Sequence, residues 1–264
     1  MLLLLKLTLA PLLVAIATTA TRKWGPKVGG LLMGLPLTTG PIFVFLAIDQ
    51  GTHFAAGATV GVLYGLIGLA AFAVAYVIVS GRTGWTGSLP FAVCTFFLFS
   101  IAARRLGTDV VVAGVAALLA LLLATLLIPR PAPGTARLPP SWWDLWVRMI
   151  TVAALTLALT AVAARLGPVL SGIVGTYPIA ITVVLTFTHA QFGRDAAVAM
   201  LRGSALAWIA FATCFLAIGL LIEAWGIALS MSIGALAAVM TSALVLWFDR
   251  RVALPSEGRN VQNS

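Results

Sequence analysis

Prolines and hydroxyl side chains occur together in two stretches of the chain, and this combination could bind a solute inside a membrane. The first stretch contains Pro36, Thr38, Thr39 and Pro41. A proline inside a helix has no amide proton, so the carbonyl oxygen four residues earlier loses its usual donor. Within a bilayer that oxygen needs another partner, which a threonine hydroxyl, a water molecule or a bound solute can supply.

The second stretch has the same character and contains Thr176, Tyr177, Pro178 and Thr182. Here Pro178 frees the carbonyl oxygen of Val174 in the same way. Helices interrupted by glycine and proline at matching positions of two halves are typical of transport sites. The alternative is a structural kink, where glycines let neighbouring helices approach closely. The sequence leaves both interpretations open.

Two ionisable residues within the predicted spans, His189 and Arg202, are further candidates for solute binding. Arg202 lies about 12 Å into a predicted helix, at 1.5 Å per residue. If it faces a cavity, it favours an anionic solute or a lipid headgroup. The alternative is that Arg202 extends to the membrane surface, aided by Asp195. Asp49, His53 and Asp195 are interpreted as interfacial helix ends.

Enzymatic, metal-dependent and nucleic-acid-binding functions find no support in the sequence. No catalytic motif of the hydrolase, metalloprotease or nucleotide-binding kind occurs, so we predict that the chain is not an enzyme. Cys94 and Cys214 lie in apolar runs and have no metal-ligand spacing, so no cofactor or metal is expected. The net charge of +9 comes from short loops and flanks, which argues against nucleic acid as a partner.

The composition predicts an all-α integral membrane protein. Hydrophobic residues make up 61% of the 264 residues and charged residues only 9%, whereas soluble domains carry roughly a quarter. Long apolar runs rather than short alternating segments exclude a membrane barrel. At about 20 residues per span, the sequence predicts nine transmembrane helices, at residues 2–20, 27–48, 54–80, 86–103, 110–128, 145–164, 168–189, 195–222 and 226–248.

A repeat of 142 residues organises these helices. The residues Gly25, Pro26, Gly30, Pro36, Gly51 and Gly61 recur as Gly167, Pro168, Gly172, Pro178, Gly193 and Gly203. We therefore divide the chain into a first four-helix module (1–104), a linking transmembrane helix (105–128), a proline-rich cytoplasmic linker (129–143), a second four-helix module (144–249) and a disordered tail (250–264).

The single linking helix determines the predicted orientation of the two modules. Four spans return the chain to the membrane face where it began, and the fifth span carries it to the opposite face. The second module therefore starts on the opposite face and is inverted relative to the first. With the N-terminus outside and the C-terminus in the cytoplasm, eleven basic residues lie on the cytoplasmic side and four outside. This distribution follows the positive-inside rule.

The run from Arg22 to Gly30 and the run from Leu35 to Pro41 resemble a group of uncharacterised bacterial polytopic membrane proteins. Each half is more distantly similar to the GlpM-like four-helix membrane proteins, whose second helix carries a glycine and a central proline. The matching residues are Gly30, Pro36, Gly172 and Pro178. The resemblance implies a location in the bacterial inner membrane and implies no reaction.

Together these patterns favour a transporter or exporter of a small molecule or a lipid-like solute, either hydrophobic or anionic. Alternating access would arise from rocking of one inverted module against the other. The alternative is a non-transporting accessory or scaffold protein of an envelope lipid or polysaccharide pathway, and a third reading is an intramembrane enzyme acting on lipid. The expected partners are the lipid bilayer and the solute, and the sequence leaves a homo-oligomer open.

Overall fold

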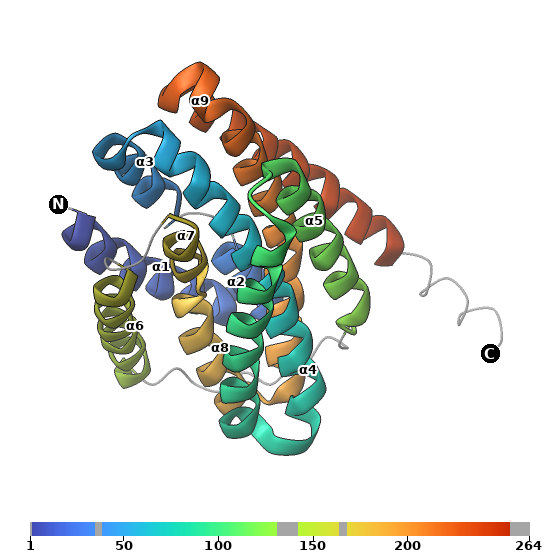
Figure 1. Ribbon diagram of the computed structural model, residues 1–264. Coiled ribbons are helices and arrows are strands. Elements are labelled where there is room, and N and C mark those ends of the chain that lie inside the picture. Colours follow the sequence, from blue (N-terminus) through green and yellow to red (C-terminus); the bar gives the residue numbers. More distant parts are fainter. Residues whose placement is uncertain (1, 35–38, 131–141, 164–167, 254–264) are drawn as a thin grey trace.

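The computed structural model describes residues 2–34, 39–130, 142–163 and 168–253, and within these ranges every regular element is a helix (Figure 1). In chain order the elements are α1 (Leu2–Trp24), α2 (Pro26–Gly34), α3 (Thr39–Gln50), α4 (Thr52–Ala103), a short 3-10 helix η1 (Arg104–Leu106), α5 (Val110–Leu127), α6 (Trp142–Ala163), α7 (Pro168–Thr176), α8 (Ile179–Phe192) and α9 (Arg194–Ala253).

The described helices have the length and surface of membrane spans. Four helical stretches are long and apolar enough to cross a bilayer, namely Thr52–Leu106, Val110–Leu127, Val169–Phe192 and Arg194–Asp249. Large apolar side chains are exposed on the outside, among them Leu126 at 81% and Val239 at 66%. Soluble monomers rarely leave extended apolar surface uncovered. The chain is therefore a helical membrane protein, as its composition predicts.

The two longest helices, α4 and α9, are hairpins. They contain 52 and 60 residues, more than twice the length of about 20 that one span needs. Each bends at a glycine with positive φ, Gly84 at 62° and Gly226 at 72°, a backbone conformation that side chains with a Cβ resist. Gly68 packs against the second arm of α4, and Thr213 donates a hydrogen bond of 3.1 Å to Thr241 across α9.

Backbone features recur at the spacing of the sequence repeat. The starts of α4 and α9, the positive-φ glycines before those starts and the two hairpin bends are each 142 residues apart. The pairs are Thr52 with Arg194, Gly51 with Gly193, and Gly84 with Gly226. A φ of 86° at Gly51 and 82° at Gly193 explains why glycine stands at both positions. The repeat therefore specifies backbone geometry.

The two halves pack against each other reciprocally. A Cβ on Gly30 in α2 would overlap the backbone carbonyl of Met200 in α9, and one on Gly172 in α7 would overlap the carbonyl of Ala58 in α4. The repeat makes Gly30 equivalent to Gly172 and Met200 equivalent to Ala58. A second pair of contacts has the same relation, Gly61 with Val169 and Gly203 with Lys27. We refer to these four contacts as the glycine seams.

Such reciprocity is the property of a two-fold interface, in which the same surface patch meets its own copy. Glycine is required in the seams because backbone lies directly against backbone, as at close helix crossings in membranes. The glycine pattern that reveals the repeat in the sequence therefore also joins the two halves.

Helix α5 has no counterpart in the repeat. Asp109 caps its N-terminus, accepting hydrogen bonds from the amides of Val111 (2.8 Å) and Val112 (3.0 Å), a favourable place for a negative charge. Only 28% of the helix Val110–Leu127 is buried, so most of α5 faces outward. It contacts α9 where Gly114 packs against Leu216.

Two predicted segments fall largely outside the described residues. Of the proline-rich linker predicted at 129–143, residues 131–141 are not described, and α6 begins at Trp142. Helix α9 continues to Ala253, so it includes the first residues of the predicted tail at 250–264. The remainder of that tail is not described.

Candidate functional site

The interrupted helix of the second half lies where its proline predicts. Helix α7 ends at Thr176 and α8 begins at Ile179, with Pro178 as the N-cap at φ −83° and ψ 65°. The amide of Tyr177 donates to the carbonyl of Val174 at 3.1 Å, and the amide of Ile179 donates to the carbonyl of Tyr177 at 2.9 Å. The oxygen freed by Pro178 therefore has a backbone donor, whereas the sequence suggested a hydroxyl, water or solute for that role.

Four predicted site residues of the second half, Thr176, Tyr177, Pro178 and Thr182, lie close together at this interruption. The hydroxyl of Thr176 is buried and donates to the carbonyl of Gly172 at 2.8 Å. The hydroxyl of Thr182 donates to that of Tyr177 at 3.4 Å. These bonds make the interruption a polar joint between two helix ends, with hydroxyl groups on both sides.

Aromatic rings from the second arm of α4 close around this joint. The ring of Tyr177 stacks on Phe97 with centroids 5.6 Å apart and an interplanar angle of 8°. Phe96 meets the same ring edge-on at 5.4 Å. Ring pairs in these geometries are favourable beyond their buried area. The polar joint of the second half is therefore next to an aromatic surface, which suits a solute with apolar parts.

The predicted site residues of the first half are Pro36, Thr38, Thr39 and Pro41. Pro36 and Thr38 fall outside the described residues. Thr39 and Pro41 lie in the first turn of α3, and the structure does not describe their side chains. The interruption predicted at Pro36 therefore lies outside the described residues, and its equivalence to the one at Pro178 comes from the sequence repeat.

His189 lies in a different place, near the end of α8. Its Nδ1 is 2.8 Å from the hydroxyl of Tyr76 on α4, and both side chains are buried. Nearby, the guanidinium of Arg194 donates to the hydroxyl of Ser80 (3.2 Å) and the carbonyl of Val77 (3.3 Å). These bonds connect α8 and the start of α9 to the first arm of α4. His189 therefore joins helices rather than lying at the interruption.

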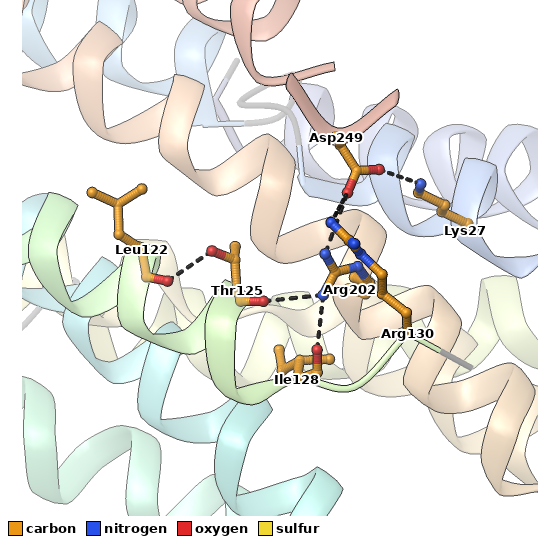
Figure 2. Close-up of polar contacts among 7 residues, drawn as sticks. All are labelled: Lys27, Leu122, Thr125, Ile128, Arg130, Arg202 and Asp249. Atoms are coloured by element: carbon orange, nitrogen blue, oxygen red, sulfur yellow. Dashed lines mark hydrogen bonds and ion pairs between the residues drawn. The ribbon is translucent and has the colours of Figure 1, made fainter. Parts of the chain in front are cut away.

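Arg202 is the centre of a second polar group. The guanidinium is buried and donates to the carbonyls of Thr125 (3.0 Å) and Ile128 (2.8 Å) at the end of α5. It also bonds the carboxylate of Asp249 at 3.3 Å. The predicted helper Asp195 pairs instead with Arg194, at 3.9 Å. Figure 2 shows Arg202 between the end of α5 and Asp249.

Asp249 brings together residues from three parts of the chain. Its Oδ2 is 2.5 Å from Nζ of Lys27 at the start of α2, and its Oδ1 is 3.6 Å from the guanidinium of Arg130 after α5 (Figure 2). We call Lys27, Arg130, Arg202 and Asp249 the Asp249 cluster. Because the last carbonyls of a helix lack donors and carry partial negative charge, Arg202 is well placed at the end of α5.

The sequence argument missed Asp249. The residue directly follows the last predicted span, 226–248, and lies near the C-terminal end of α9, where the helix dipole disfavours a carboxylate. That unfavourable position was the available signal, since it requires a cation nearby. The sequence could not identify the cations that pair with Asp249, because Lys27 is 222 residues away and Arg202 is 47 away. Only the packing of the helices brings them together.

The comparisons with known proteins identify no relative. No family model matches the chain, and no curated protein or solved structure matches it either. The resemblance to the GlpM-like proteins therefore stays a prediction. Among the described residues, no group of three or more His, Cys, Asp or Glu side chains could hold a metal ion.

Proposed function

We propose that this chain is a membrane transporter or exporter of a small-molecule or lipid-like solute, hydrophobic or anionic. The observation that carries the proposal is the helix interruption at Pro178, between α7 and α8, in one of two halves that contact each other reciprocally. The sequence repeat makes Pro36 its equivalent in the first half. Interrupted helices from two repeats commonly form the solute site of secondary transporters. Because α2 packs on α9 and α7 on α4, rocking of one half would move both interruptions.

The proposed architecture is nine spans in two inverted modules of four helices, joined by α5. The hairpins α4 and α9 supply two spans each, at 52–83 with 85–103 and at 194–225 with 227–253. The pairs α2 with α3 and α7 with α8 each form one interrupted span, and α1 and α6 each form one. An odd helix between the modules inverts the second, and the reciprocal glycine seams support a two-fold relation between them.

The proposed location is the bacterial inner membrane, with the N-terminus outside and the C-terminus in the cytoplasm. Reporter proteins fused after residue 264 and within residues 131–141 should both report cytoplasm. An extracytoplasmic signal from either fusion contradicts the nine-span order, since both positions follow an odd number of predicted spans.

The solute class follows from the surroundings of the second interruption. Hydroxyls of Thr176, Tyr177 and Thr182 lie beside the rings of Phe96 and Phe97. Acidic side chains that would attract a bare cation do not occur among these residues. Such a site favours a solute that has an apolar body and a group able to accept hydrogen bonds.

Water access at the two interruptions tests the proposal without knowledge of the solute. Single cysteines are placed by Thr38→Cys or Thr182→Cys in a chain whose Cys94 and Cys214 are changed to alanine. A membrane-impermeant maleimide is then applied to right-side-out and inverted vesicles. A transporter should be labelled at both positions, from one face or the other. Absence of labelling at both positions contradicts a pathway through them.

Flux measurements test the role of the interruption itself. The probes are a fluorescent short-chain phospholipid and a fluorescent organic anion in sealed vesicles. Pro178→Ala and Thr182→Val should reduce flux at an unchanged folded level. The matched control is Pro90→Ala, since Pro90 lies within α4 and does not interrupt it. Equal flux of both probes in all variants and in empty vesicles contradicts transport of these classes.

One observation favours a second function, that of a non-transporting accessory or scaffold protein in an envelope lipid or polysaccharide pathway. The carbonyl of Val174 accepts the amide of Tyr177, and the hydroxyl of Thr176 bonds within its own helix. Interruptions satisfied in this way can serve as joints for close packing. In that case the maleimide labels neither position 38 nor position 182.

A further inference from the structure

We propose that Lys27 and Arg130 bind the phosphate of an anionic phospholipid on the outer side of the Asp249 cluster. This site lies apart from the helix interruptions and does not depend on transport. It is formed by the start of α2, the residues after α5 and the end of α9, and Figure 2 shows the four charged side chains together.

Exposure within the cluster separates its charges into an inner and an outer layer. The side chains of Asp249 and Arg202 are 7% and 10% exposed, whereas those of Lys27 and Arg130 are 51% and 45% exposed. The carboxylate therefore lies beneath two accessible cations. Among the residues that the structure describes, three positive charges surround one negative charge, so this part of the accessible side is positive.

The two outer cations are positioned before any ligand arrives. Asp249 holds Lys27 at 2.5 Å through Oδ2 and Arg130 at 3.6 Å through Oδ1. Two like charges from different parts of the chain would otherwise repel each other. A phosphate between an ammonium and a guanidinium would gain charge-assisted hydrogen bonds with little further ordering of the side chains.

The neighbouring side chains indicate a lipid rather than a soluble anion. Trp247 and Phe248, directly before Asp249, are 46% and 59% exposed, and Trp24, close to Lys27 in sequence, is 62% exposed. Aromatic residues of this kind gather at the headgroup level of a bilayer, and basic groups at that level attract anionic lipid. Cations beside exposed aromatic rings match the phosphate and the adjoining glycerol and acyl carbons of a phospholipid.

Occupation of the site would connect the two halves. Lys27 belongs to the first half, Asp249 to the second, and Arg130 follows the linking helix. A phosphate bound to Lys27 and Arg130 would reduce their mutual repulsion and so stabilise the contact of α2 with α9. Anionic lipid should therefore raise the thermal stability of the whole chain.

Native mass spectrometry of the full chain, released from detergent micelles with added phosphatidylglycerol or phosphatidylcholine, measures the binding. The wild type should retain phosphatidylglycerol in preference to phosphatidylcholine. K27Q with R130Q should bind phosphatidylglycerol about 30-fold more weakly, at about fivefold for each cation near a membrane surface. The control K23Q with R82Q removes the same charge from exposed positions outside the Asp249 cluster and should keep the wild-type affinity.

Two further variants and a competition experiment distinguish a specific lipid site from the alternatives. K27R with R130K retains both charges and should retain the lipid, and R130Q alone, about fivefold weaker, replaces the double variant if that one does not fold. If K27Q with R130Q and K23Q with R82Q lose the same affinity for phosphatidylglycerol, the effect comes from general surface charge and the proposal is overturned. Displacement of phosphatidylglycerol by an equal concentration of inorganic phosphate assigns the site to a soluble anion and also overturns it.

Discussion

The glycine seams and the Asp249 cluster both join the two halves, but only the seams are repeated. Gly30 with Met200 has its equivalent in Gly172 with Ala58. The positions equivalent to Arg202, Asp249 and Lys27 are Val60, Gly107 and Val169, none of which carries a charge. Close steric packing is thus required in both copies of the seam, whereas the ion pairs of the Asp249 cluster occur beside only one of them.

This difference gives the two copies of the seam unequal costs of separation. At the copy beside the Asp249 cluster, moving α2 away from α9 breaks the Lys27–Asp249 contact and exposes a carboxylate that is 7% exposed. Separating the equivalent apolar positions breaks van der Waals contacts alone.

The largest effect is expected from filling a glycine seam. Gly30→Leu and Gly172→Leu should each destabilise the chain by about 4 kcal/mol or more, because the new side chain meets backbone that cannot move aside. Thermal unfolding in detergent and the yield of folded protein measure the loss. Gly175→Leu is the matched control, since Gly175 is exposed on the same helix as Gly172 and has open space around it. Clearly different losses of stability for Gly30→Leu and Gly172→Leu would show that the two seams are not equivalent.

Removal of Arg202 should have the next largest effect. Arg202→Leu leaves the ends of α5 and α9 without their shared cation and should cost about 3 kcal/mol, the size found for breaking a buried ion pair. The equivalent change Val60→Leu should cost less, about 1 to 2 kcal/mol, because it adds one methylene group to apolar packing and breaks no ion pair. Adding Asp249→Leu to Arg202→Leu should restore part of the loss. If the Arg202 variant is as mild as the Val60 variant, the cluster does not stabilise the interface.

The smallest effect is expected at the Tyr76–His189 hydrogen bond. The repeat places Ile218 and Ala47 at the equivalent positions, so this bond also occurs once. Tyr76→Phe should cost about 1 kcal/mol, since it removes one neutral hydrogen bond and keeps the ring. A double-mutant cycle with His189→Phe, read by thermal unfolding, measures the coupling. Fully additive losses would show that the pair contributes nothing beyond packing.

Much of the backbone could be predicted from residue types along the chain. The apolar runs marked helices. Of the two bends, Gly84 falls between predicted spans and Gly226 is the first residue of one. Pro178 marked the end of α7, because a proline amide cannot continue the hydrogen-bond pattern. The sequence did not predict the partner of the Val174 carbonyl. A tight turn brings the amide of Tyr177 to this oxygen, in place of the hydroxyl, water or solute that was expected.

The sequence by itself determined where helices form and break, because hydropathy and the sterics of glycine and proline act locally. It also showed that one pattern of glycines occurs twice. The tertiary structure alone decided what those glycines touch and which charges meet. Met200 lies against Gly30, and Asp249 beside Lys27, only after the halves have packed. Ion pairs and close backbone contacts depend on relative position in space, which residue type does not specify for segments 170 or more residues apart.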